Sequence, residues 1–207
     1  MSSNYDNAAW FYDRLSRIVF GHALVKAQVY LFKHIQPDAH ILIVGGGTGW
    51  ILEELTRIHP SGLQITYVEI SSKMIALSQK RNVGDNKVIF INEAIENVPG
   101  LGEFDVIITP FLFDNFTGQT VKKVFGHINN LLKLKGLWLN TDFQLTDKWW
   151  QTALLKTMLL FFKLCCRIES SKLTDMEKYF EHAGYQATDK KTFFGDFIMS
   201  KAYRKTN

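Results

Sequence analysis

The segment ILIVGGGTG, residues 41–49, constrains the fold of this chain more than any other. Four apolar residues run directly into three alternate glycines, Gly45, Gly47 and Gly49. A short apolar run bounded by a turn is typical of a buried strand, and glycine permits the positive φ angles and close backbone approach of a sharp turn. We therefore predict a buried strand, a glycine turn that includes Gly46, and a helix beginning near Gly49 whose first amides face a bound group.

The glycine spacing argues against two common ligands of such a turn. A dinucleotide-binding turn needs glycine at its first, third and sixth positions, and the sixth position counted from Gly45 is Trp50. A phosphate-binding P-loop needs Gly-Lys-Ser or Gly-Lys-Thr after the turn, and neither follows here. On this segment alone, a flexible turn without a ligand remains the alternative.

Apolar runs alternate with helical patterns after the turn. In order, they are LQITYVEI, SKMIALSQKR, KVIFINEA, FDVIITPF, VKKVFGHINNLLK and GLWLNTDF. This alternation predicts βαβ units around a parallel sheet, and 207 residues suit one α/β domain. We expect an N-terminal helical cap over residues 1–36, a ligand-binding core over 37–207, and an apolar lid insertion at about 144–172 within that core.

The ends of the predicted strands are candidate binding positions, because ligands of an open parallel sheet bind beyond the carboxyl ends of its strands. These ends fall at Gly45, Glu69, Glu93, Thr109 with Pro110, and Asp142. Glu69 lies 20 residues beyond Gly49, where an acidic side chain can accept hydrogen bonds from both hydroxyls of a ribose. Met74, in the next helix, can pack on a flat ring. The alternatives are a solvated carboxylate at Glu69 and core packing at Met74.

The glycine turn, Glu69 and the segment NEAIEN together resemble the class I S-adenosylmethionine-dependent methyltransferases, from His40 to Lys201. The resemblance implies a Rossmann-like, doubly wound, mostly parallel seven-stranded sheet with helices on both faces and an antiparallel last strand. It also implies S-adenosylmethionine as the cofactor. The methionine part would lie at the glycine turn, the ribose at Glu69, and the adenine at Glu93 and Ala94.

Carried over by position, the resemblance assigns cofactor binding to Gly45, Gly46, Gly47, Gly49, Glu69, Ile70, Met74, Glu93, Ala94, Thr109 and Tyr12. The assignment of Tyr12 comes from NAAWFYDRLSRIVFG, which resembles the opening of the ubiquinone and menaquinone C-methyltransferases. Tyr12 would close over the methionine group, with core packing as the alternative. One position departs from the family: Ile43 stands where an acidic residue usually precedes the first glycine by two places.

Two other functions are weighed against methyl transfer. GGGTG followed by VEI also resembles the spermidine synthases, which transfer an aminopropyl group and carry an aspartate-rich segment after the fourth strand. That segment reads ITPFLFDNF here, with Asp114 as its one acid, so methyl transfer is favoured. The other alternative is a methyltransferase-like module that binds a partner through residues 149–166, because fold does not fix function.

Methyl transfer is an in-line displacement at an activated carbon, so the main task of the protein is to align the reacting atoms. No base is obligatory, and we assign no catalytic residue. Asp13, Asp114 and Asp142 are candidate bases, with a helix cap or a solvent-facing turn as the alternative for each. The six histidines are scattered without ligand spacing, so we expect no metal site.

Aromatic and aliphatic residues in the lid insertion and the N-terminal segment predict a closed apolar pocket for a small hydrophobic or aromatic molecule. We expect Phe111, Trp149 and Trp150 to contact this substrate. The alternative is that the apolar segments pack against each other or against a second copy of the chain in a homodimer.

Charge and apolar patterning indicate the setting in which the chain acts. The 24 Lys and Arg residues are spread along the sequence and give a net charge of +4, so we expect no nucleic-acid partner. The apolar segment 153–166 contains Lys156 and Lys163 and is too short to span a bilayer. The neighbouring Cys165 and Cys166 argue against a disulfide framework, and the N-terminus lacks a signal-peptide pattern. We therefore expect a cytoplasmic protein without a membrane span.

Overall fold

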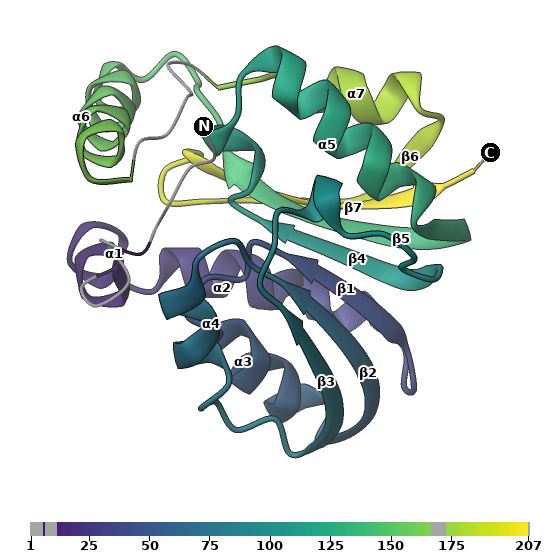
Figure 1. The fold of residues 1–207 in the computed structure, drawn as a ribbon. Helices are drawn as coiled ribbons and strands as arrows, with labels where there is room; N and C mark the ends of the chain where they lie inside the picture. Colours follow the sequence, from purple (N-terminus) through teal and green to yellow (C-terminus); the bar gives the residue numbers. More distant parts are fainter. Residues whose placement is uncertain (1–5, 7–11, 167–172, 207) are drawn as a thin grey trace.

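The computed structural model describes residues 6, 12–166 and 173–206 and shows a seven-stranded sheet of order β3-β2-β1-β4-β5-β7-β6 (Figure 1). Strands β1 to β5 pair in parallel, and β7 is antiparallel to both of its neighbours. This arrangement confirms the predicted fold class. The strands are β1 (His40–Val44), β2 (Ser61–Val68), β3 (Asp85–Ile91), β4 (Phe104–Pro110), β5 (Leu132–Phe143), β6 (Tyr185–Phe193) and β7 (Ile198–Lys205).

Helices cover both faces of the sheet (Figure 1). One face carries α2 (Ala23–Val29), the 3-10 helix η2 (Tyr30–His34), α3 (Trp50–Ile58) and α4 (Ser72–Ser78). The other carries the 3-10 helix η3 (Ile95–Asn97), α5 (Gly118–Asn130) and α7 (Met176–His182). Beyond the carboxyl ends of the strands lie α1 (Tyr12–Phe20), the 3-10 helix η4 (Phe113–Asn115) and α6 (Trp149–Cys166).

Alternate residues of β1 enter the two core layers, as the period of a strand requires. Leu42 and Val44 pack toward α5, whereas Ile41 and Ile43 pack toward α3. Ile43 is fully buried. The place of the family's usual acid is therefore occupied here by a core side chain.

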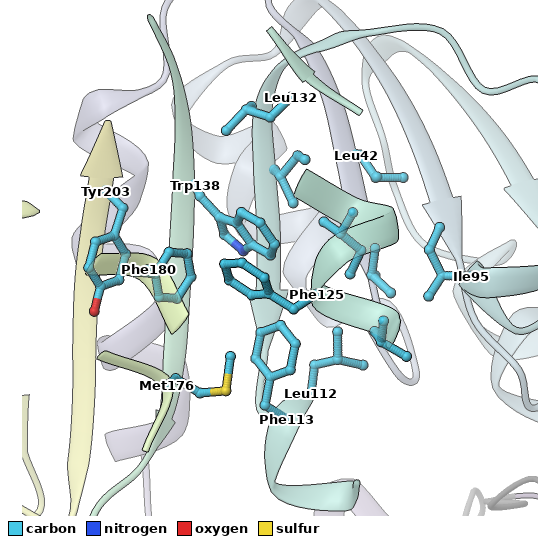
Figure 2. Packing of buried hydrophobic residues seen from close by; sticks show 14 of the residues in the cluster. Leu42, Ile95, Leu112, Phe113, Phe125, Leu132, Trp138, Met176, Phe180 and Tyr203 are labelled. Carbon is cyan, nitrogen blue, oxygen red and sulfur yellow. The ribbon is translucent and has the colours of Figure 1, made fainter. Parts of the chain in front are cut away.

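The core under α5 and α7 is aromatic (Figure 2). The rings of Phe125 and Trp138 stack with centroids 4.9 Å apart, and those of Phe180 and Tyr203 stack at 3.8 Å. Aromatic pairs contribute about 0.5–1.5 kcal/mol each beyond their buried area. This packing fixes β5 and β7 beneath the helices and so holds the carboxyl end of β5 in place.

The predicted N-terminal cap divides into two parts in the structure. Leu31 and Phe32 of η2 are buried in the same layer as Ile41, so α2 and η2 cover a face of the sheet. Of the described residues before His40, α1 is the helix that lies over the carboxyl ends of the strands (Figure 1). Within the described residues, no helix has both the length and the apolar character that crossing a membrane requires.

Candidate functional site

The glycine turn after β1 adopts the left-handed conformation that its sequence predicts. Gly45, Gly47 and Gly49 have φ angles of 74°, 63° and 81°, which favour glycine. A Cβ on Gly46 would lie 2.4 Å from the hydroxyl oxygen of Tyr67. That hydroxyl donates a hydrogen bond of 2.9 Å to the carbonyl of Gly47. The turn is therefore held against β2, with bare backbone toward the space above the sheet.

Glu69 follows β2 and lies against the turn. Its Oε2 accepts a hydrogen bond from the backbone N–H of Gly47 at 3.1 Å, and its Oε1 accepts one from the N–H of Ser71 at 2.9 Å. Burial raises the pKa of Glu69, and the backbone N–H groups oppose this rise. Each carboxylate oxygen keeps a further lone pair for a ligand, so Glu69 has the acceptor capacity that two neighbouring hydroxyls require.

Glu93 and Ala94 follow β3. The Oε1 of Glu93 accepts hydrogen bonds from the N–H of Ala94 at 2.9 Å and from Nδ2 of Asn97 at 3.2 Å. These bonds lower the pKa of Glu93, first through Ala94 and then through Asn97. The exposed carboxylate is thus ionised at the rim of the site and held in one orientation.

One cavity of about 620 Å³ joins the ends of β1, β2, β3 and β4. Most of the sequence-predicted positions share its wall, although they come from segments far apart in the chain. The predicted residues that line it are Gly45, Gly46, Gly47, Glu69, Ile70, Met74, Glu93, Ala94 and Phe111.

Two predicted cofactor positions lie outside this wall and have structural roles instead. A Cβ on Gly49, at the start of α3, would lie 2.5 Å from Cβ of Ser78, so glycine there lets α3 pack on α4. Thr109 is fully buried, donates to Asn140 and accepts from the indole N–H of Trp138, both at 2.8 Å.

The predicted substrate residues on α6 also lie away from the cavities. The side chain of Trp149 is 82% exposed, and the ring of Trp150 packs against Phe194 and Phe197. The helix turns other residues toward the sheet, which the local sequence did not reveal. Tyr12 begins α1, but its side chain lies outside the described part of the chain.

An acidic side chain on α1 holds this helix against the glycine turn. The hydroxyl of Thr48 donates to the carboxylate of Asp13 at 2.8 Å. Arg81 donates through Nε to the carbonyl of Thr48 at 2.9 Å and through Nη2 to Asp13 at 3.3 Å. We call Asp13, Thr48 and Arg81 the α1 clamp. The sequence marked Asp13 as a candidate base. Its partners come from the glycine turn before α3 and from the segment after α4, so no local pattern in the sequence indicated the clamp.

A second cavity of about 210 Å³ adjoins the first. Ser16, Leu24, Phe111 and Asn115 line both. Apart from Asp114 and a few other polar residues, its wall consists of apolar side chains, most of them from α1 and α6. Phe111 has a φ of 51°, a conformation that is rare for a bulky residue and that marks strain of the kind found at binding sites.

Known proteins share this sequence and architecture. Residues 41–136 match the family described as methyltransferase domain. The chain is 32% identical over 145 residues to a ubiquinone/menaquinone biosynthesis C-methyltransferase of Wigglesworthia glossinidia brevipalpis. This alignment covers 67% of this chain and 57% of that protein. It is 44% identical over 59 residues to a polyamine aminopropyltransferase of Bacillus subtilis. This alignment covers 28% of this chain and 20% of that protein. The chain thus spans about half or less of the length of these relatives.

A solved structure shows the same fold. The 1,6-didemethyltoxoflavin N1-methyltransferase of Burkholderia thailandensis, bound to 1,6-didemethyltoxoflavin and S-adenosylhomocysteine, aligns with a TM-score of 0.68 at 15% identity, covering 98% of this chain and 86% of that one. The fold and the matches confirm the resemblance to class I S-adenosylmethionine-dependent methyltransferases. The match to the family described as methyltransferase domain extends over residues 41–136.

Proposed function

We propose that this protein is an S-adenosylmethionine-dependent methyltransferase that acts on a small apolar or aromatic molecule. One observation carries the proposal: the buried carboxylate of Glu69, with acceptor capacity left over, shares a cavity of about 620 Å³ with the glycine turn and with Glu93 and Ala94. A nucleoside with a charged tail needs these groups in this order along a sheet edge.

The residues present fit the cofactor. The glycine turn would hold the methionine part, Glu69 the two ribose hydroxyls, and Glu93 and Ala94 the adenine edge, with Met74 against its face. Met74 is almost fully buried yet lines the cavity, which suits contact with a flat ring. The α1 clamp holds α1 beside this region, and its Asp13 also lines the cavity.

The bound cofactor supplies a methyl group on a positively charged sulfur, and the protein positions the nucleophile in line with it. Such positioning can supply roughly 7–11 kcal/mol of barrier lowering. Phe111, whose ring packs on Phe143 with centroids 4.8 Å apart, forms a wall of both cavities. Its place suits a residue that orients the acceptor beside the reacting carbon.

The substrate class is supported by the second cavity. Its apolar wall, formed largely by α1 and α6, matches the apolar pocket expected from the sequence, although other residues than Trp149 and Trp150 build it. Apolar pockets with few polar groups bind small ligands by burying their surface. A homodimer and the cytoplasmic setting stay predictions.

Aminopropyl transfer is the second candidate, because the match to the polyamine aminopropyltransferase reaches 44% identity over 59 residues. That activity uses a cofactor without the methionine carboxylate and a cationic amine as acceptor. The largely apolar wall of the second cavity favours methyl transfer.

Isothermal titration calorimetry tests the proposal. We expect S-adenosylhomocysteine to bind the protein with one site and to bind more tightly than the decarboxylated analogue. The matched variants are Glu69→Gln, which we expect to weaken binding, and Glu181→Gln, an exposed site on α7 outside the cavity wall, which leaves it unchanged. Failure of both nucleosides to bind would overturn both transferase functions, and tighter binding of the decarboxylated form would favour aminopropyl transfer.

A further inference from the structure

The second cavity contains an ionisable group that the proposed function has not used. Among the described residues, Asp114 is the one ionisable side chain in its wall. Asp114 belongs to η4, directly after β4, and its carboxylate accepts a hydrogen bond from Nδ2 of Asn115 at 2.8 Å. Because Asn115 lines both cavities, this carboxyl lies near the boundary between them.

A second carboxyl, that of Asp142 near the end of β5, lies outside the cavity lining and acts on Asp114 through its charge. Asp142 is 8% exposed. Its Oδ1 accepts a hydrogen bond from the N–H of Phe143 at 2.9 Å, whereas its Oδ2 is buried and has no hydrogen-bond partner among the described residues. A buried carboxylate oxygen without a hydrogen bond disfavours the charged form of the group.

The two carboxyls influence each other's protonation. Burial raises the pKa of Asp142 to about 7. Burial, and then the charge of Asp142, raise the pKa of Asp114 well above its usual value. Asp142 is the one described ionisable group whose charge acts on Asp114. Because each negative charge disfavours the other, the pair keeps one proton near neutral pH, and its ionised member can accept another in the range in which a general base works best.

We propose that Asp114, supported by Asp142, is the base that takes the proton of the methyl acceptor in the second cavity. This inference rests on the proposed methyltransferase function and names its acceptor class: an apolar ring that carries one protic O–H or N–H group. The ring would fill the space between α1 and α6, and the protic group would point to Asp114, near the boundary with the cofactor cavity.

The reaction balances without a further reactant. The lone pair of the acceptor oxygen or nitrogen forms the new bond to the methyl carbon. The bond between that carbon and sulfur breaks, and its electron pair stays on sulfur. The proton of the acceptor passes to a carboxylate oxygen of Asp114 and then to solvent. Asp142 is a positioning residue, because its charge sets how strongly Asp114 holds that proton.

Binding of a fluorescent probe tests the inference on the whole protein saturated with S-adenosylhomocysteine. The probes are 2-naphthol, which carries the protic group, and 2-methoxynaphthalene, which lacks it. At pH 8 we expect 2-naphthol to bind about tenfold more tightly, since a hydrogen bond to a charged group is worth that much. Asp114→Asn should abolish this preference. Met158→Trp, which places a larger side chain in the cavity from α6, should weaken the binding of both probes by the same factor.

The pH dependence separates the role of Asp142 from a structural one. In the wild-type protein, the preference for 2-naphthol should rise with pH as the carboxyl pair loses a proton. In Asp142→Asn the midpoint of this rise should move to lower pH, because the charge that raises the pKa of Asp114 is gone. A purely structural role would leave the midpoint in place.

The outcomes distinguish this inference from the proposed function. If S-adenosylhomocysteine binds but the two probes bind equally, or if Asp114→Asn keeps the preference, Asp114 is not the proton acceptor and the methyltransferase proposal stands. If Met158→Trp changes the affinity for neither probe, or if the diamine putrescine displaces 2-naphthol, the assigned acceptor class is wrong. If S-adenosylhomocysteine does not bind, the proposed function itself fails.

Discussion

The two adjoining cavities are built in different ways. The larger one is formed by the ends of β1 to β4, where backbone turns and, among the described residues, the one buried acid Glu69 face the space that we propose for the cofactor. The smaller one is formed by α1, α6 and the ends of β4 and β5, whose apolar side chains meet across long stretches of sequence. This difference indicates that the strand ends of the fold would hold the cofactor. The helices α1 and α6, at the edge of the sheet, would hold the methyl acceptor.

The largest effect should come from the carboxyl pair of the smaller cavity. The pKa of Asp142 is about 7 in the folded protein and near 3.8 when the chain is unfolded. The folded state therefore binds more protons than the unfolded state between these values, and stability is lost as the pH rises from about 4 to about 7. The loss should be about 4 kcal/mol, since each pKa unit corresponds to about 1.4 kcal/mol.

Urea unfolding at pH 4.5 to 8 measures this loss. Asp142→Asn should show a shallower decline and should be more stable than the wild type above pH 7. An equally steep decline in the variant would show that the buried carboxyl is not the cause.

The next largest effect concerns the larger cavity. Glu69→Ala should weaken S-adenosylhomocysteine binding by about ten- to a hundredfold, since it removes an acceptor shared by two ribose hydroxyls. Calorimetry of the variant checks this, and the affinity for 2-naphthol serves as an internal control that should not change. An unchanged dissociation constant for the nucleoside would remove Glu69 from the site.

The α1 clamp lines the larger cavity, and the α1 helix that it holds also forms part of the smaller one, so its loss should affect both moderately. Asp13→Asn should weaken S-adenosylhomocysteine binding roughly threefold, because a partly exposed ion pair contributes little. Asp105→Asn, which breaks an exposed pair with Lys133 outside both cavity walls, is the matched control. Equal effects of the two variants would argue against a specific role for the clamp.

A smaller effect is expected at the rim. Glu93→Ala should weaken nucleoside binding by less than Glu69→Ala does, because the backbone of Ala94 can still contact the adenine. Titration calorimetry under the same conditions gives the ratio of the two effects. A loss larger than that at Glu69 would shift the main recognition of the nucleoside to the end of β3.

The smallest effect is expected on α6. Trp149 is 82% exposed, so Trp149→Ala should leave both S-adenosylhomocysteine and 2-naphthol binding unchanged in calorimetry and fluorescence titration. A marked loss of 2-naphthol binding would show that α6 rearranges when the smaller cavity is filled.

The larger cavity could be predicted from the sequence because its parts are local. Each strand end is followed at once by a residue of the cavity wall, as with the turn at Gly45 and with Glu69, so strand order alone brings these residues together. Thr109 failed this rule because its side chain points into the core, where Asn140 and Trp138 need a hydrogen-bond partner.

The smaller cavity could not be predicted in the same way. Which face of α6 meets the sheet depends on its packing against α1 and the β6–β7 turn, and its nearly uniform apolar sequence gives no periodic signal. The pairing of Asp114 with Asp142 likewise depends on β4 and β5 ending side by side. Both features arise from tertiary contacts between distant segments.

A crystal structure with bound S-adenosylhomocysteine tests the central claim most directly. We predict both ribose hydroxyls within hydrogen-bond distance of the carboxylate of Glu69, the adenine beside Ala94 and Met74, and the homocysteine tail along the glycine turn from Gly45 to Gly47. The sulfur should then point toward Phe111 and the smaller cavity. A nucleoside that binds elsewhere, with Glu69 still bonded only to Gly47 and Ser71, would contradict the account.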